Sequence, residues 1–99
     1  MQIVTTQHLE AIIRLLLHSP KYAMKRIAFQ KIIHPHPKSS FAYRMVSSLL
    51  KEGYFLEHPM GETTLYRLNK EKLFLSLSQE PFFEPFLEML QDQGEVILL

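Results

Sequence analysis

Five polar side chains between residues 40 and 51 are spaced so that they would share one face of a helix. They lie at positions i, i+3, i+4, i+7 and i+11, as Ser40, Tyr43, Arg44, Ser47 and Lys51. Because an α-helix completes a turn in about 3.6 residues, this spacing places them on one flank. The face carries two bases, two hydroxyls and a phenol, all of which can donate hydrogen bonds to a partner. The pattern predicts a binding face.

Residue types that could perform catalysis or bind a metal lack a supporting pattern. Three glycines in the whole chain leave no room for a glycine-rich phosphate loop, and no Ser-His-Asp set or carboxylate pair stands at a suitable spacing. His34, His36 and His58 are enough ligands in number for a metal, but prolines separate the first two and no carboxylate is adjacent. We therefore expect no enzyme, no metal site and no cofactor, and interpret these histidines as loop residues.

Charge is unevenly distributed along the chain, although the net charge is only +1. The window from residue 21 to 51 has no acid and seven bases: Lys21, Lys25, Arg26, Lys31, Lys38, Arg44 and Lys51. Residues 71–99 have six acids against one base, Lys72. Such asymmetry is typical of a nucleic-acid contact surface. The alternative is that the charges are sorted by chance among solvated helix faces.

The bulk composition is that of one small globular domain. The chain has 99 residues, 46% of them hydrophobic and 21% charged, which is enough for a single core without disulfides. It has no cysteine, and residues 1–6 lack the basic and apolar regions of a secretory signal. No apolar run exceeds four residues, so we expect no membrane span and a cytoplasmic location.

Three helices are predicted before residue 53. The first covers residues 6–18, with Thr5 or Thr6 as its cap, and ends at Ser19-Pro20. Its inward stripe is Leu9, Ile12, Ile13, Leu16 and Leu17. The second covers residues 22–33. Its inward stripe is Met24 or Ala23, Ile27, Ala28 and Ile32, with Lys25, Arg26 and Lys31 turned outward.

The third helix should follow a rigid, extended connector at residues 34–37, which contains two prolines. It is capped by Ser39 or Ser40 and runs to about Glu52, where Gly53 stops it in a left-handed conformation. Its buried stripe is Ala42, Met45, Val46, Leu49 and Leu50.

A β-hairpin is predicted next, because β-favouring residues flank a turn that contains proline and glycine. The strands are residues 54–57 and 63–68, the turn is 58–62, and Asn69 closes the hairpin. Two helical patterns follow from residues 70 and 81, and Gly94 breaks the second before an apolar tail at 96–99.

The second C-terminal pattern contains an apolar cluster, Phe82, Phe83, Phe86, Leu87 and Leu90. Two interpretations are open. The cluster can pack back on the first helix, or it can form a dimerisation seam with a second copy. We favour dimerisation, since three short helices and a hairpin offer limited apolar surface to cover so many phenylalanines.

The order helix, helix, helix, hairpin, helix resembles the winged helix-turn-helix family. The most specific match is residues 46–55, with a helix ending in Leu49-x-x-x-Gly53 and then a hydrophobic strand, followed by a returning strand at residues 65–68 with Tyr66 turned inward. The resemblance covers residues 6–69 and is closest to small prokaryotic regulators of the ArsR and MarR kind. It implies a mainly α fold with a β-hairpin, with a winged domain at 1–69 and a C-terminal helical extension at 70–99.

The resemblance also implies how the chain would meet DNA. The third helix would lie in the major groove with Ser39, Ser40, Tyr43, Arg44 and Ser47 toward the bases, and Arg44 is suited to a guanine edge. Lys38 at the helix N-terminus suits a phosphate. Phosphate contacts are also expected from Lys25, Arg26 and Lys51.

Two features depart from the family pattern. The connector at 34–38 is longer and richer in proline than the usual tight turn, so the third helix can be angled differently. The wing has Glu57, His58 and Glu62 but no Lys or Arg at its tip, so Arg67 on the returning strand is the substitute contact.

These observations predict a homodimer that binds double-stranded DNA as a transcriptional regulator. The main alternative is a winged-helix protein-interaction module within a larger assembly, whose basic face meets an acidic protein. A third interpretation is a DNA-binding antitoxin or phage factor whose C-terminal region contacts a partner protein.

Overall fold

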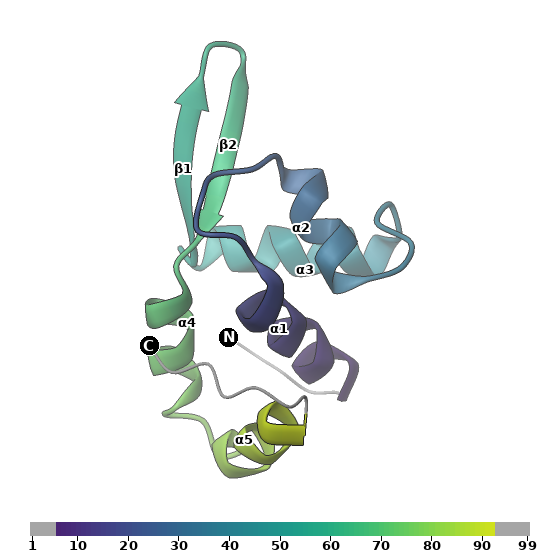
Figure 1. Cartoon of the computed structure of the whole chain (residues 1–99), viewed down its shortest axis with the longest axis vertical. Coiled ribbons are helices and arrows are strands. Elements are labelled where there is room, and N and C mark those ends of the chain that lie inside the picture. The colour runs from purple at the N-terminus through teal and green to yellow at the C-terminus, as the bar shows by residue number, and fades with distance from the viewer. Residues whose placement is uncertain (1–5, 93–99) are drawn as a thin grey trace.

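Three helices, a β-hairpin and two further helices make up the described part of the chain. The computed structural model describes residues 6–92, and Figure 1 shows the order of its elements. The helices are α1 Thr6–His18, α2 Arg26–Ile33, α3 Ser40–Lys51, α4 Lys70–Leu77 and α5 Phe83–Asp92. The strands are β1 Phe55–Met60 and β2 Thr63–Leu68. The expected α+β class is confirmed, and none of these helices has the length and apolarity needed to cross a membrane.

α1 is the central helix of the core, and its predicted bounds are confirmed. It packs against α2 and also against α5, which lies below it in Figure 1. Because α1 is covered from both directions, Ala11 and Leu15 are buried in addition to the expected Ile12, Ile13 and Leu16. Apolar residues on several sides of α1 are consistent with a helix that is covered by more than one neighbour.

α2 begins four residues later than the sequence predicts. Met24 is extended instead of helical, because its backbone pairs with that of Tyr66 on β2. The Met24 N–H donates to the Tyr66 carbonyl (2.8 Å), and the Tyr66 N–H donates to the Met24 carbonyl (2.7 Å). This long-range pairing satisfies backbone groups that a helix at residues 22–25 would have used. The helix therefore starts at Arg26.

The buried stripe of α2 also differs from the prediction. Phe29, Gln30 and Ile33 are buried, whereas the expected Ile27, Ala28 and Ile32 are half-buried. The Phe29 ring meets the Phe55 ring of β1 edge to face, with centroids 4.8 Å apart. In a short helix with apolar residues on several sides, the largest ring takes the deepest position.

The connector between α2 and α3 bends, which corrects the expected extended form. His34 has extended backbone angles, with φ −148° and ψ 143°. The Ser39 N–H then donates to the His36 carbonyl (2.9 Å), closing a turn with Pro37 at its second position. Proline fixes φ near the value that this turn position requires, so the same residue that excludes helix promotes a turn.

α3 begins and ends as predicted. Ser39 is the cap, since its Oγ accepts a hydrogen bond from the Ala42 N–H (3.1 Å). Gly53 follows the helix with φ 81°, in the left-handed region that favours glycine. The inward side is Ala42, Met45, Val46 and Leu49, with Leu50 half-buried at its edge.

The hairpin is longer than predicted and its turn is shorter. The register runs from Phe55 opposite Leu68 to Met60 opposite Thr63, so only Gly61 and Glu62 form the turn. Pro59 was assigned to the turn, but it lies in β1, whose outer edge has no pairing strand within residues 6–92. An edge strand accepts proline because no ladder hydrogen bond is lost there. The hairpin projects from the helices in Figure 1.

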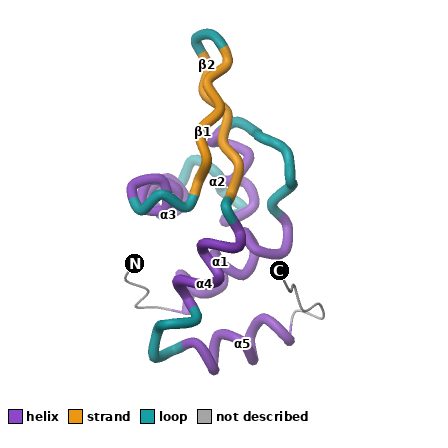
Figure 2. Tube along the Cα trace, turned by 90° about the vertical axis from the view of Figure 1, so that its left-hand side faces the viewer, coloured by secondary structure: helices purple, strands orange, loops and turns teal. Residues whose placement is uncertain are grey.

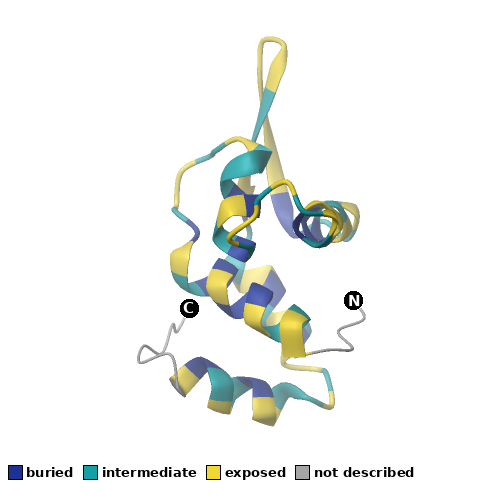
Figure 3. Cartoon of the chain, turned by 90° about the vertical axis from the view of Figure 1, so that its right-hand side faces the viewer, coloured by how far each residue is buried: buried dark blue, intermediate teal, exposed yellow. Residues whose placement is uncertain are grey.

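The C-terminal helices complete the core of the single chain. Leu73 and Leu77 of α4 and Phe86 and Leu90 of α5 are buried in the same apolar cluster as α1. Figure 3 shows α5 with its buried positions toward the rest of the molecule. Asn69 closes the hairpin and caps α4, since its Oδ1 accepts from the Lys72 N–H (3.1 Å).

The five apolar residues predicted at a dimer seam differ in how far they are buried in the single chain. Phe86 and Leu90 are buried within the chain, as the packing-back interpretation expects, and Phe82, Phe83 and Leu87 are half-buried. Phe83 stacks on Phe86 with ring centroids 6.2 Å apart. The predicted cap Thr5, the break at Gly94 and the tail at 96–99 lie outside the described residues.

Replacing Phe86 by alanine tests whether α5 belongs to the core of one chain. We expect Phe86→Ala to lower the free energy of unfolding by about 3–5 kcal/mol, because a large ring is removed from a close-packed site. Leu87→Ala, a change at the half-buried neighbour, should cost clearly less. Urea unfolding measures both. A midpoint that rises with protein concentration, with Phe86→Ala removing that dependence, would instead place Phe86 in a dimer contact.

Candidate nucleic-acid interface

The outer flank of α3 carries the predicted polar face. Ser40, Tyr43, Arg44 and Lys51 are exposed, and Tyr43 shows 55% of its surface to solvent. Ser47 is half-buried. Figure 3 shows α3 nearly end on, with its exposed positions on the side away from the other helices. Four of the five residues are therefore available to a partner in the single chain.

Arg26 of α2 reaches across to this flank and is not turned outward, which corrects the sequence prediction. Its Nη2 donates to the Tyr43 carbonyl (2.7 Å) and to the Ser47 hydroxyl. Its guanidinium also lies over the Tyr43 ring, 4.1 Å from the centroid, in a cation–π contact. Arg26 thus holds α2 against α3, and Ser47 is occupied by it.

Gln30 extends this network to the connector. Its Oε1 accepts from Arg26 Nε (3.0 Å), and its Nε2 donates to the Pro37 carbonyl (2.6 Å). Gln30 is only 5% exposed, so both ends of its buried amide are satisfied. We name Arg26, Gln30, Tyr43 and Ser47 the α2–α3 clamp. It fixes where the polar flank of α3 sits relative to the rest of the fold.

Sequence reasoning missed this clamp, although a signal for it exists. Arg26 and Gln30 are four residues apart, as are Tyr43 and Ser47, so each pair shares a helix face. Two polar pairs of this spacing on consecutive helices can interlock when the helices pack. Whether the two pairs meet depends on which face of α2 is buried. The buried face observed includes Phe29, Gln30 and Ile33, whereas the sequence predicts Ile27, Ala28 and Ile32.

Arg44 is an exposed base on the flank. Its Nε donates weakly to the Ser40 carbonyl one turn earlier, at 3.3 Å. Among the described residues, neither terminal nitrogen of Arg44 has a hydrogen-bond partner. The planar fork of the guanidinium can therefore donate two parallel bonds to a ligand.

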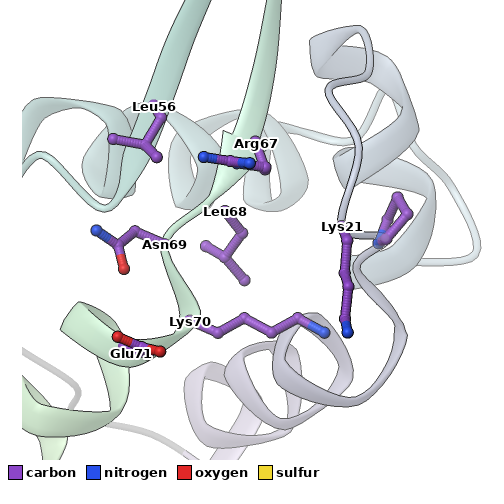
Figure 4. Close-up of a pocket in the computed structure, with 8 residues that line it drawn as sticks. Lys21, Leu56, Arg67, Leu68, Asn69, Lys70 and Glu71 are labelled. Atoms are coloured by element: carbon purple, nitrogen blue, oxygen red, sulfur yellow. The ribbon is translucent and has the colours of Figure 1, made fainter. Parts of the chain in front are cut away.

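The other predicted contact residues separate into two groups. Lys25 directly precedes α2 and Lys38 directly precedes the Ser39 cap of α3, and both lysines are exposed. Ser39 lies there too, but its hydroxyl is engaged in capping. Arg67 is exposed on β2 and lines a pocket together with Lys21 of the loop between α1 and α2 (Figure 4). That loop lies on the other side of the hairpin from α3 (Figure 2). The structure therefore does not bring Arg67 together with the α3 face.

The hairpin tip offers no positive charge. Residues 59–62 are exposed and include Met60 (62% exposed) and Glu62, as the sequence indicated. The histidines are also dispersed. His34 and His36 have ring centroids 5.6 Å apart in the connector, whereas His58 lies on β1. No group of three potential metal ligands gathers within residues 6–92.

Comparisons with known proteins add no evidence on the fold family or the function of this chain. No protein-family model matches the chain, and searches of the curated proteins and of the solved structures found no match.

Removing the Arg26 guanidinium from the α2–α3 clamp should destabilise the fold. Arg26→Met keeps the aliphatic stem but removes hydrogen bonds to Tyr43, Ser47 and Gln30, one of them to a buried amide. We expect a loss of about 1–3 kcal/mol in the free energy of unfolding, because these groups would be left without their hydrogen-bond donor. Lys25→Met removes the same charge from an exposed neighbour and should change stability by less than about 0.5 kcal/mol. Equal values for the two variants would show that the clamp contributes nothing.

Proposed function

We propose that this chain binds double-stranded DNA through the outer flank of α3 and acts as a transcriptional regulator. We also propose that its fold is a winged helix-turn-helix. In this proposal α2 and α3 are the helix-turn-helix pair, and β1 and β2 form the wing. The observation that carries it is the exposure of Tyr43, Arg44 and Lys51 together on one helix flank, within a window that contains no acid.

The dimensions of α3 suit a major groove. A 12-residue helix is about 18 Å long, and the groove of B-DNA is about 12 Å wide, enough to admit a helix with its side chains. Arg44 is then the residue suited to a base edge, because its terminal nitrogens are available and guanine offers two acceptors side by side. Tyr43 and Ser40 add hydrogen-bonding groups on the same flank.

Phosphate contacts are assigned to the lysines at the margins of the face. Lys25, Lys38 and Lys51 are exposed, and each can neutralise a phosphate without reading sequence. Arg26 has a different role in this proposal from the one expected from sequence. It positions Tyr43 and Ser47 and is not counted among the phosphate contacts.

Dimerisation remains a prediction within this proposal. Phe86 and Leu90 are used in the chain's own core, so a seam with a second copy would use the half-buried Phe82, Phe83 and Leu87. A symmetric dimer would present two α3 helices to two half-sites of one duplex.

One observation favours a second candidate function, a protein-interaction module. Leu56 and Met60 lie on the same side of β1 and are exposed, at 38% and 62%, while the hairpin tip has no base to contact DNA. An acidic protein could then meet the basic face, with the hairpin adding apolar contacts. The two functions differ in whether random duplex DNA is bound at all.

Binding to a fluorescent random-sequence duplex at several salt concentrations tests the function. We expect binding at low salt, with log K falling against log salt at a slope of about −3 per protomer. That slope corresponds to roughly three phosphate contacts at −0.9 each. Absence of binding at 50 mM salt, or a slope near zero, would contradict the DNA proposal and favour the protein-interaction module.

Arg44→Ala locates the contact within the same assay. On a duplex selected from a random pool, we expect a loss of about 1–3 kcal/mol and a relaxed base preference, with a smaller loss on random duplex. Lys21→Gln removes one positive charge from the loop on the other side of the hairpin and serves as the matched control. Equal losses for Arg44→Ala on selected and random DNA would show that Arg44 does not read a base.

A further inference from the structure

A pocket of about 430 Å³ lies at the base of the hairpin, where three separate segments meet. The loop between α1 and α2 supplies Pro20 and Lys21, the hairpin supplies Leu56 and Arg67, and the start of α4 supplies Lys70. Figure 4 shows these side chains around the pocket. The volume falls within the range of small-molecule sites in proteins.

The pocket gathers three bases, Lys21, Arg67 and Lys70, against one acid, Glu71. Figure 4 shows the ammonium groups of Lys21 and Lys70 next to one another, with Arg67 above them. Glu71 is the one carboxylate at the pocket, and Lys70 extends away from it toward Lys21. Placing two ammonium groups side by side is unfavourable in the free protein, and an anion between them would relieve the repulsion.

The pKa of Lys70 is affected by the same surroundings. Burial, and secondarily the nearby Lys21 ammonium, lower the pKa of Lys70 from its ordinary value. Lys70 is therefore disfavoured in its charged form both by partial burial and by a like charge. Such an arrangement is more frequent where a ligand completes the charge balance.

We propose that this pocket binds a small organic phosphate, with Lys21 and Lys70 on the phosphate, Arg67 adding positive charge at the edge of the pocket, and Pro20 and Leu56 on an adjoining apolar group. A phosphate monoester carries a charge of about −1.5 to −2 at pH 7 and three acceptor oxygens, which matches a pair of lysines better than a single carboxylate does. Leu56 is 38% exposed, so its side chain is available to cover a small apolar body.

This site is distinct from the α3 face. Figure 2 shows α3 on one side of the hairpin and the loop between α1 and α2 on the other. A duplex lying along α3 would therefore leave Lys21 and Lys70 free. The proposal stands on the pocket alone and does not require that the chain bind DNA.

Titration of the ¹⁵N-labelled chain with phenyl phosphate tests the proposal, with inorganic phosphate as the probe of charge alone and phenol as the probe of the apolar group alone. We expect saturable shifts at residues 20–21 and 67–71, and tighter binding of phenyl phosphate than of either partial probe. Lys70→Gln should weaken binding about tenfold or more, as expected for one lost charge-assisted hydrogen bond. Lys21→Gln should do the same.

The control is Lys31→Gln, which removes the same charge from an exposed position on α2. It should leave the affinity for phenyl phosphate unchanged. Lys70→Gln and Lys21→Gln each remove a like-charge contact, so both variants should unfold at no lower temperature than the wild type. Shifts scattered over all lysines, or equal weakening by Lys31→Gln, would overturn the proposal. Displacement of phenyl phosphate by duplex DNA would also overturn the proposal, since the pocket would then be a binding site for the duplex backbone.

Discussion

The guanidinium of Arg26 lies between α2 and the solvent side of α3, where it donates to the Tyr43 carbonyl, to Ser47 and to Gln30. The apolar contacts beneath it hold the two helices together, but they allow sliding and rotation, because packed ridges are compatible with several crossing angles. Directional hydrogen bonds remove that freedom. The position of the outer flank of α3 therefore depends on the hydrogen bonds of this half-buried cation to α3 and to Gln30.

The clamp has a cost for binding and a benefit for recognition. It withdraws Arg26 and Ser47 from a partner, which lowers the number of positive charges on the face. In exchange, Tyr43 and Arg44 are presented from a rigid element, so less side-chain and backbone freedom is lost on binding. The pocket on the other side of the hairpin uses a different set of bases, Lys21, Arg67 and Lys70, so the two surfaces can be altered separately.

The sequence predicts the local features of this fold well and the long-range ones poorly. The bounds of α1, the Ser39 cap and the stop at Gly53 follow from short-range periodicity and capping, and the structure confirms them. The start of α2 depends on Met24 pairing with Tyr66, forty-two residues later, and no local pattern encodes that bond. The same holds for the site. Helical spacing locates the exposed flank, whereas the enclosure of Arg26 and the meeting of Lys21 with Lys70 arise only when distant segments pack.

A two-dimensional ¹H–¹⁵N spectrum of the labelled chain, recorded as a random-sequence duplex is added at low salt, reports which surface of the protein meets DNA. If the flank of α3 binds the duplex, the largest changes fall on the amides of Ser40, Tyr43, Arg44 and Lys51. The amides of α5 and of residues 67–71 should stay in place. Changes confined to the outer side of the hairpin or to α5 would show that the flank held by Arg26 is not the surface that meets DNA.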